Sequence, residues 1–375
     1  MTSIYAINPD RNKPWNELPL FPIHKDNYYS LDIYEALVES KAALARLQGR
    51  SATLSNQGVL INTISLQEAK ASSAIENIFT TDDELYKAYS ETDQKPIFGA
   101  PKEVLRYREA LWQGQAYMND KADFDLEYLD LVYQTVKEAN DSLRPPFSQI
   151  VIRQGGTELN TGKVIYTPPR GKAVLEKLIA NLLDFLNDDE KYPVDPLLKM
   201  VMGHFQFEAI HPYRDGNGRT GRIFNIHYLT HKGLLDFPIL FLSKFIIQNK
   251  EEYYGCLAGI SQRGDWKKWI LYMLKAVELT SNDTYNKINE ILTAKDAILE
   301  ELQKNSSIRR PELLVEIIFT QPYTKVKHLT DKKDFAENTA RNYLNTLCEL
   351  QVLEKRTIEG HHYYLNLELY RILSD

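Results

Sequence analysis

Residues 211–222 limit the possible folds of this chain more than any other stretch. Before them, apolar residues recur at helical spacing over 196–210, and after them a second, largely apolar helix is predicted to begin near Gly218. His211 precedes a proline, a position that disfavours the α region, so the first helix is predicted to end there. The sequence therefore predicts two helices joined by a short loop, called here the 211–222 loop.

The composition of this loop suits an anion. Gly216 and Gly218 allow the backbone to turn its N–H groups inward, and the start of the following helix presents partial positive charge at the same point. Arg219 and Arg222 are three residues apart, so both can lie on one face of the first helical turn and bind separate phosphates. Together these features predict a polyphosphate site.

Asp215 and His211 add chemistry to the predicted anion site. A carboxylate beside phosphates is repulsive unless a divalent cation lies between them, so Asp215 predicts Mg²⁺ bridging its carboxylate and a polyphosphate. The imidazole of His211, at the entrance of the loop, has the right chemistry to take a proton from an attacking hydroxyl.

Two other interpretations of the loop fit less well. Residues 216–221 match the glycine pattern of dinucleotide-binding folds, but that pattern follows a β-strand, and here a helix is predicted instead. A purely structural helix–loop–helix turn does not need two arginines, an aspartate and a histidine together.

The loop resembles the signature of Fic-domain proteins, His-Pro-aromatic-x-acidic-Gly-Asn-Gly-Arg-x-x-Arg. Every specified position is met, with Tyr213 in the aromatic place. The resemblance implies transfer of AMP from ATP to a hydroxyl side chain of a protein, with His211 as the base and Asp215 as the Mg²⁺ ligand. It assigns the phosphates to Gly216, Asn217, Gly218, Arg219 and Arg222.

Ser72 and Glu76 are four residues apart in a helix predicted to begin near residue 60. With Asn77 they resemble the inhibitory motif that some Fic proteins carry before the catalytic core. A glutamate that reached the loop would pair with Arg222 and take the place of the γ-phosphate oxygens, while Ser72 would fix the helix by hydrogen bonding. Such a pair is common on helix surfaces, so the prediction depends on its combination with the loop.

Two further regions are assigned by the same resemblance. Residues 150–152 and 164–166 flank a run with Gly155, Gly156, Asn160 and Gly162, which predicts a β-hairpin. In Fic proteins such a flap pairs with the backbone of the target protein, a role expected here for Val164, Ile165, Tyr166 and Thr167. A tyrosine lines the adenine pocket in relatives, which implicates Tyr254, although Ser261 stands where some relatives have asparagine.

In the remaining chain, Gly49 is expected to end a helix over 30–47. Further helices are predicted in two parts of 101–140, over 173–186, from near 248, and over 266–303. After a linker at 304–310, three helices and a hairpin turning at Glu359–Gly360 resemble a winged helix-turn-helix. Its third helix would present Arg341 and Asn342 to a DNA groove. Acidic residues offset the basic ones there, so a protein-interaction or dimerising role is the alternative.

Composition narrows the possible classes of protein. With 375 residues and a net charge of −6, the chain has no global basic field that points to nucleic acid. Cys256 and Cys348 lack histidine partners at metal-binding spacing and are interpreted as reduced thiols. No stretch resembles a signal peptide or a membrane span, which predicts a cytoplasmic protein.

We therefore predict a mainly α protein in three parts. Residues 1–100 form an N-terminal arm and a helical region with the inhibitory helix, 101–303 a Fic catalytic core with a β-hairpin flap, and 311–375 a small winged helix-turn-helix domain. The expected activity is adenylyl transfer from ATP, with Mg²⁺, to a Ser, Thr or Tyr hydroxyl of a protein partner, this chain included, held back by Glu76. A homo-oligomer is expected, and no membrane. The alternatives are a DNA-binding regulator that senses nucleotide and a Fic protein that removes AMP.

Overall fold

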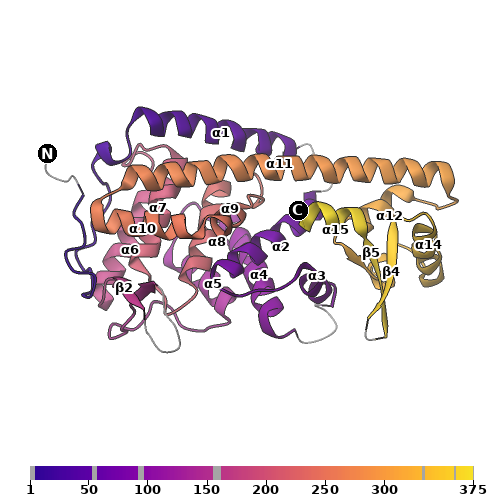
Figure 1. Ribbon diagram of the computed structural model, residues 1–375, viewed down its shortest axis with the longest axis horizontal. Helices are drawn as coiled ribbons and strands as arrows, with labels where there is room; N and C mark the ends of the chain where they lie inside the picture. The colour runs from indigo at the N-terminus through magenta and orange to yellow at the C-terminus, as the bar shows by residue number, and fades with distance from the viewer. Residues whose placement is uncertain are drawn as a thin grey trace.

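The computed structural model of the protein describes residues 5–52, 57–91, 97–154, 162–331, 334–358 and 360–374. The fold is mainly helical, as predicted, with a large helical body and a small C-terminal domain at one end (Figure 1). Four residues of the predicted turns, Gly155, Gly156, Asn160 and Glu359, lie outside the described residues.

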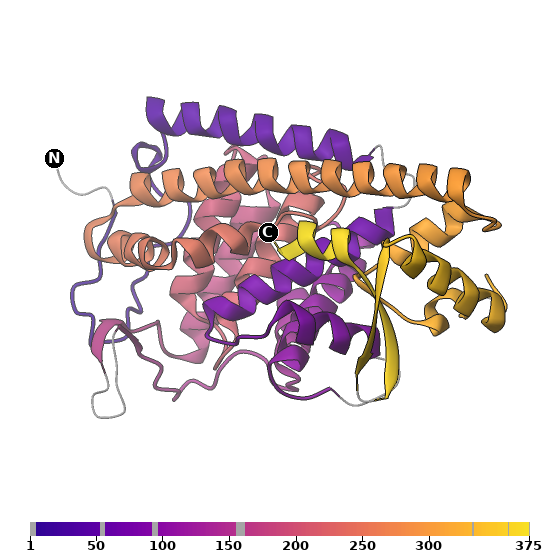
Figure 2. The same cartoon turned by 45° about the vertical axis from the view of Figure 1, so that its right-hand side comes forward.

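Two long helices form one side of the body. After a single turn of 3-10 helix at Lys25–Asn27, α1 (Leu31–Ala52) runs alongside α11 (Trp266–Asn305), as Figures 1 and 2 show. The prediction that Gly49 ends the first helix is wrong. A single glycine costs a helix only about 1 kcal/mol, and the buried residues Leu47 and Ser51 on either side keep α1 packed on the core.

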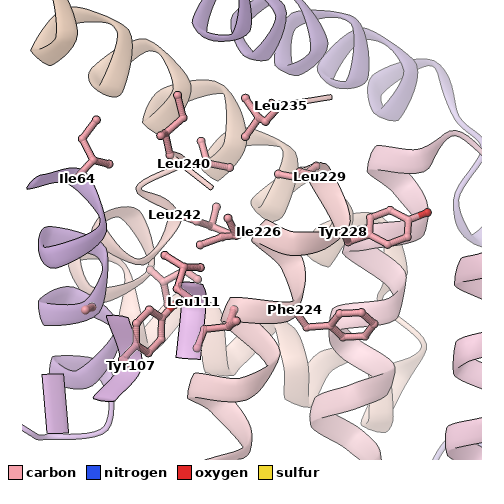
Figure 3. Packing of buried hydrophobic residues seen from close by; sticks show 14 of the residues in the cluster. Ile64, Tyr107, Leu111, Phe224, Ile226, Tyr228, Leu229, Leu235, Leu240 and Leu242 are labelled. Atoms are coloured by element: carbon pink, nitrogen blue, oxygen red, sulfur yellow. The ribbon is translucent and has the colours of Figure 1, made fainter. Parts of the chain in front are cut away.

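The body is organised around two buried helices, α7 (Pro196–Ile210) and α8 (Asn217–His231). Both are buried around nearly their whole circumference, which is typical of helices in the centre of a bundle. Figure 3 shows Phe224, Ile226 and Leu229 of α8 packed among residues of neighbouring helices, among them Tyr107 and Leu111. The surrounding helices are α2 (Gln57–Ile75), α4 (Gly99–Asn119), α5 (Leu126–Lys137), α6 (Lys172–Asn187), α9 (Leu242–Gln248) and α10 (Lys250–Arg263).

The predicted hairpin is present as two short antiparallel strands. Strand β1 (Ile152–Gln154) pairs with β2 (Lys163–Tyr166), with Ile152 opposite Tyr166 and Gln154 opposite Lys163, and the register shifts after Ile152. In the described part of the chain this sheet has only these two strands.

The C-terminal domain contains the predicted three helices and hairpin, together with two elements that the sequence pattern did not reveal. The helices are α12 (Pro311–Ile318), α13 (Val326–Thr330) and α14 (Glu337–Glu349), and the hairpin is β4 (Leu353–Ile358) with β5 (His361–Asn366). The additional elements are β3 (Tyr323–Thr324), which pairs with β5, and the final helix α15 (Leu367–Ser374). Helix α15 returns to the body, where Lys287 Nζ of α11 donates to the carbonyl of Ile372 at 2.7 Å.

The exposed side of α14 has mixed charge. Arg341, which was predicted to face DNA, donates to the carboxylate of Glu337 at 2.6 Å. Asn342 is exposed beside it. DNA contact through this helix stays a prediction. Within the described ranges, no helix is both long and apolar enough to cross a membrane.

Two helical glycines give a matched test of the packing. A Cβ added at Gly114 of α4 would lie 2.5 Å from His227 Cε1. That ring cannot easily move, because its two nitrogens bond Tyr128 Oη at 2.6 Å and the Leu111 carbonyl at 2.8 Å. A Cβ added at Gly49 would have no atom within 4 Å, apart from its chain neighbours and the backbone of its own helix.

We expect Gly114→Ala to lower the free energy of unfolding by about 1–3 kcal/mol, because it overpacks the core. Gly49→Ala, the control, should raise it by about 0.5–1 kcal/mol, because alanine loses less backbone entropy in a helix. Urea unfolding followed by circular dichroism measures both. Equal effects of the two substitutions would contradict the packing around His227.

Candidate active site

His211 lies at the C-terminal end of α7, as predicted. Its N–H still donates to the Phe207 carbonyl at 3.0 Å, but its backbone is in the left-handed region, with φ 50° and ψ 59°. The chain thus leaves the helix by a sharper turn than the extended conformation usual before proline. Non-glycine residues held at positive φ are strained and cluster at functional sites.

The loop after His211 is held closed by its own side chains. The amide of Asn217 accepts from Tyr213 N at 2.8 Å and donates to Tyr213 O at 2.9 Å. The Tyr213 ring stacks on Tyr133, with centroids 4.0 Å apart, and its hydroxyl donates to Asp130 at 2.9 Å. Asn217 was predicted to contact phosphates, and in this structure its side chain is used to fix the loop.

Two glycines leave the N-terminal end of α8 open. Gly216 precedes the helix with φ 74°, and a Cβ there would lie 2.9 Å from the side chain of Lys137. A Cβ on Gly218 would collide with Glu76 Oε1 and lie 2.9 Å from Arg222 Nη1. The first turn of α8 can therefore be approached closely by other groups, as an anion site at a helix N-terminus requires.

Asp215 forms an ion pair with Lys137, whose Nζ lies 2.7 Å from Asp215 Oδ2. Partial burial raises the pKa of Asp215, but Lys137 and the N–H of Gly216 together hold it below its usual value. Among the described residues, no group of three or more His, Cys, Asp or Glu side chains could hold a metal ion. Mg²⁺ often binds one or two carboxylates plus substrate phosphates, and the position of Asp215 beside the open end of α8 fits that arrangement.

The two loop arginines contact carboxylates on different helices. Arg219 Nη1 donates to Glu103 Oε2 of α4 at 2.7 Å. Arg222, only 1% exposed, instead reaches the C-terminal end of α2. Its Nε donates to Ser72 Oγ at 2.8 Å, and its Nη2 donates to Ser72 O and Glu76 Oε1, both at 2.9 Å. The structure thus brings Ser72 and Glu76 together with Arg222.

This contact has a clear electrostatic basis. The last carbonyls of α2 carry the partial negative charge of a helix C-terminus, so a guanidinium is stabilised there. Burial lowers the pKa of Arg222, but the surrounding acidic groups, Glu76 foremost, hold it above its ordinary value. Arg222 is therefore a charged group whose hydrogen-bond partners are Ser72 in the last turn of α2 and Glu76 just after it.

A cavity of about 210 Å³ opens beside this ion pair. His211, Gly218, Arg222 and Glu76 line it, together with residues of the flap and of helices α7 and α10. The volume is below the roughly 300–1,000 Å³ typical of small-molecule sites. The wall residues are Ile152, Ile165 and Tyr166 of the flap, Phe205, Glu208 and Ala209 of α7, and Tyr253, Tyr254, Leu257, Ala258 and Ser261 of α10.

Two titratable groups in this cavity have strongly shifted pKa values. Burial lowers the pKa of His211 to about 4, with a smaller contribution from the Arg144 charge, so its imidazole is neutral at pH 7. Burial also raises the pKa of Glu208 to about 7. Among the described residues, Glu208 Oε1 is buried without a hydrogen-bond partner. Such groups in a cleft mark a candidate functional site.

The flap is fixed to the body close to His211. Tyr166 Oη donates to the Ala209 carbonyl of α7 at 2.8 Å. Thr167 O accepts from Trp15 N at 3.1 Å, and Thr167 Oγ1 donates to the Arg11 carbonyl at 2.6 Å. Ile165 and Tyr166 line the cavity, whereas Val164 is half-buried nearby on the same strand.

Tyr254 also lines the cavity. Its ring packs edge-on against Tyr253, with centroids 5.2 Å apart. Ser261, at the position where some relatives have asparagine, is buried and donates to the Ala258 carbonyl at 3.1 Å.

Arg144 is a residue of this site that sequence reasoning missed. Only 3% exposed, it donates through Nε to the His211 carbonyl at 2.7 Å and through Nη2 to the carbonyls of Ile210 and Pro169. It therefore joins the end of α7 to the segment that leaves the flap. In the sequence it is a single arginine before two prolines, and no local pattern separates it from a surface arginine.

Replacing Arg144 with Ala should raise the pKa of His211 from about 4 toward the ordinary value of histidine, because a nearby positive charge is removed. It should also lower the free energy of unfolding by about 1–3 kcal/mol, because carbonyls lose a buried donor. An NMR titration of the imidazole measures the first effect. Arg144→Lys keeps the charge and should keep most of the depressed pKa. An unchanged pKa in the alanine variant would rule out this electrostatic role.

Three protein-family models match consecutive parts of the chain. The N-terminal model of the Fic/DOC family matches residues 34–116, and the Fic/DOC family model matches residues 125–229, which include the whole 211–222 loop. A model for the C-terminal domain of SoFic-like protein adenylyltransferases matches residues 294–369.

Named relatives match part of the chain. The protein adenylyltransferase fic-1 of Caenorhabditis briggsae is 29% identical over 39% of this chain and 29% of its own length. The corresponding protein of Caenorhabditis elegans is 30% identical over 38% of this chain and 26% of its own length. The chain thus spans less than a third of these relatives.

Solved structures share the fold. A Fic family protein from Desulfovibrio desulfuricans aligns with a TM-score of 0.56 and 21% identity, over 90% of this chain and 97% of that one. Fic-1 of C. elegans aligns with a TM-score of 0.52 and 16% identity, over 68% of this chain and 74% of that one. The chain therefore carries a Fic domain with its N-terminal region and a SoFic-like C-terminal domain, and it is homologous to protein adenylyltransferases.

Proposed function

We propose that the protein transfers AMP from ATP to a Ser, Thr or Tyr hydroxyl of a target protein, this chain included, and that Glu76 inhibits the transfer. The observation that supports this most is that the neutral imidazole of His211 and the guanidinium of Arg222 line one cavity at the open end of α8. An anion site and a base in one cavity are what adenylyl transfer needs.

In the proposed reaction, the attacking hydroxyl oxygen forms a bond to the α-phosphorus of ATP. The bond from that phosphorus to the bridging oxygen breaks, and pyrophosphate leaves. His211 takes the proton of the hydroxyl, and its low pKa keeps it unprotonated and available at pH 7. Burial, which lowers that pKa, also removes water from around the imidazole.

The rest of the loop would hold the polyphosphate. The N–H groups at the start of α8, with Gly216, Asn217 and Gly218, bind the α- and β-phosphates. Arg219 binds the β-phosphate and Arg222 the γ-phosphate, each after release from its present carboxylate partner. Mg²⁺, held by Asp215 once Lys137 has moved aside, would neutralise phosphate charge.

The remaining contacts define the nucleotide and the target. Tyr254, which lines the same cavity, is proposed to contact adenine. The flap would receive the target backbone along β2, so that its hydroxyl enters beside His211. The bond from Tyr166 to the Ala209 carbonyl supports this role, because it ties the strand to the helix that carries His211.

Inhibition follows from the shared use of one guanidinium. Arg222 already has three bonds to Ser72 and Glu76, and the Glu76 carboxylate lies directly against Gly218. An incoming γ-phosphate would need both that guanidinium and that space. With Glu76 in place, ATP would bind with its phosphates displaced, and a displacement of about 1 Å can cost on the order of 10²-fold in rate.

We therefore expect Glu76→Gly to raise the rate of auto-modification by at least about tenfold, because Arg222 is freed to bind the γ-phosphate. Adding Arg222→Ala to this variant should cancel the gain. The measurement is incorporation of label from ATP labelled at the α-phosphate. An unchanged or lower rate in a folded Glu76→Gly variant would contradict inhibition by Glu76.

His211→Ala provides the control for chemistry. In the Glu76→Gly background it should lower the labelling rate by about 10²–10⁴-fold, the usual effect of losing a general base. ATP affinity should be nearly unchanged, because the phosphates are held by other groups. If Glu76→Gly binds ATP but no protein is labelled, a nucleotide-sensing regulator is the better interpretation. The expected homo-oligomer stays a prediction.

A further inference from the structure

Helix α3 (Asp82–Glu91) lies between the inhibitory helix and the C-terminal domain. Figures 1 and 2 show α3 next to the strands of that domain, whereas α2 ends farther from them and the segment after it runs back to α3. A short connection joins Glu76, just after the end of α2, to the start of α3. Helix α3 is therefore the next element in the chain after the segment that carries Glu76.

On one side, α3 is bonded to α2. Gln67 Nε2 of α2 donates to Asp82 Oδ1 at 3.0 Å and also bonds the hydroxyl of Tyr86. Lys70 Nζ forms an ion pair with Asp82 Oδ2 at 2.6 Å, with both side chains largely buried. Gln67 and Lys70 precede Ser72 on the same helix, so these bonds hold α3 against the helix whose last turn carries Ser72.

On its other side, α3 is bonded to the C-terminal domain. The hydroxyl of Tyr323, a fully buried residue in β3, donates to Asp83 Oδ1. Arg356 of β4 donates to the same hydroxyl at 3.1 Å and lies 3.7 Å from Asp83 Oδ1. Tyr370 of α15 packs edge-on against Tyr86, with ring centroids 6.1 Å apart.

The contacts form a continuous path from the C-terminal domain to the cavity. Tyr323 of the C-terminal domain contacts Asp83 of α3, and the neighbouring Asp82 contacts Lys70 of α2. Glu76, just after the end of α2, contacts Arg222. The residues that line the cavity come from no later in the chain than Ser261. In this structure the C-terminal domain therefore does not line the cavity, and it reaches the site through contacts between elements, such as this path.

We propose that the C-terminal domain strengthens the inhibitory contact between Glu76 and Arg222 by holding α3, and that loosening its hold on α3 activates the enzyme. The proposal rests on the function proposed above. The two states differ in whether the end of α2 is docked on Arg222 or released from it. A hydrogen bond from a buried tyrosine to a carboxylate is charge-assisted, so its loss biases this equilibrium toward release.

The test uses the whole chain with single substitutions that remove one hydroxyl or one charge. Tyr323→Phe removes the hydroxyl that reaches Asp83 and keeps the buried ring. Asp83→Asn removes the charge from the other partner. The control is Tyr343→Phe, which removes a hydroxyl of the same domain that accepts from Arg309 N and has no part in the path.

Tyr323→Phe and Asp83→Asn should each raise the auto-modification rate about fivefold, within the usual range of coupling between sites. Tyr343→Phe should leave it unchanged. In the Glu76→Gly background the first two substitutions should have no further effect, because the contact they weaken is already absent. An unchanged rate in a folded Tyr323→Phe variant, or an equal gain in the Glu76→Gly background, would overturn the proposal.

A second measurement does not depend on catalysis. Ile78 N donates to the Ser73 carbonyl at 3.0 Å, where the end of α2 is closed. Amide hydrogen exchange at residues 76–78 should become about fivefold faster in Tyr323→Phe and stay the same in Tyr343→Phe. If Glu76→Gly itself fails to raise the rate, the proposed inhibition fails, while exchange still decides the coupling. Unchanged exchange in Tyr323→Phe would refute the coupling.

Discussion

The proposed function depends most on the contact between Arg222 and the end of α2, because this contact decides whether the guanidinium is available to ATP. One buried guanidinium binds a hydroxyl, a carbonyl and a carboxylate there, in the planar arrangement that arginine provides and lysine does not. Burying a charge is costly unless it is paired, so Arg222 must always have an anionic partner. Glu76 is that partner in this structure, and the γ-phosphate of ATP is the other candidate. In the proposed function, inhibition and catalysis therefore compete for the same side chain.

The other parts of the site, around the contact between Arg222 and Glu76, are held in place by buried helices and hydrogen bonds. His211 and the loop are carried by two helices that are buried on nearly all sides. Asn217 closes the loop, and Arg144 fixes the backbone of His211. Sites built on such elements hold their geometry more precisely than sites on free loops. The end of α2 is different, because its position depends on contacts that can be replaced.

The sequence alone was enough to predict those parts of the site whose functional residues lie close together in one short stretch. The 211–222 loop combines helix ends, glycines and charges in one place, and the structure brings its His211 and Arg222 to one cavity. Ser72 and Glu76 could be matched with Arg222 because, with Asn77, they resemble the inhibitory motif of some Fic proteins, whereas their spacing alone would not separate them from an ordinary pair on a helix surface. The helices of the C-terminal domain followed from apolar periodicity.

Other features depend on contacts between distant segments, which periodicity does not encode. Arg144 meets the His211 carbonyl across 67 positions of the sequence. Helix α3 matters because Asp83 meets Tyr323, 240 positions away. Gly49 was wrongly expected to end α1, because the local preference of one glycine is weaker than the burial of its helical neighbours.

The most direct test of the account is a pair of crystal structures with Mg²⁺ and a non-hydrolysable ATP analogue, one of the parent protein and one of Glu76→Gly. In the variant, Arg222 should bind γ-phosphate oxygens at about 2.7–2.9 Å. In the parent, Arg222 should stay on Glu76, with the γ-phosphate bound elsewhere. The same γ-phosphate position in both structures, with Arg222 still on Glu76 in the parent, would contradict the claim that Glu76 and ATP compete for this guanidinium.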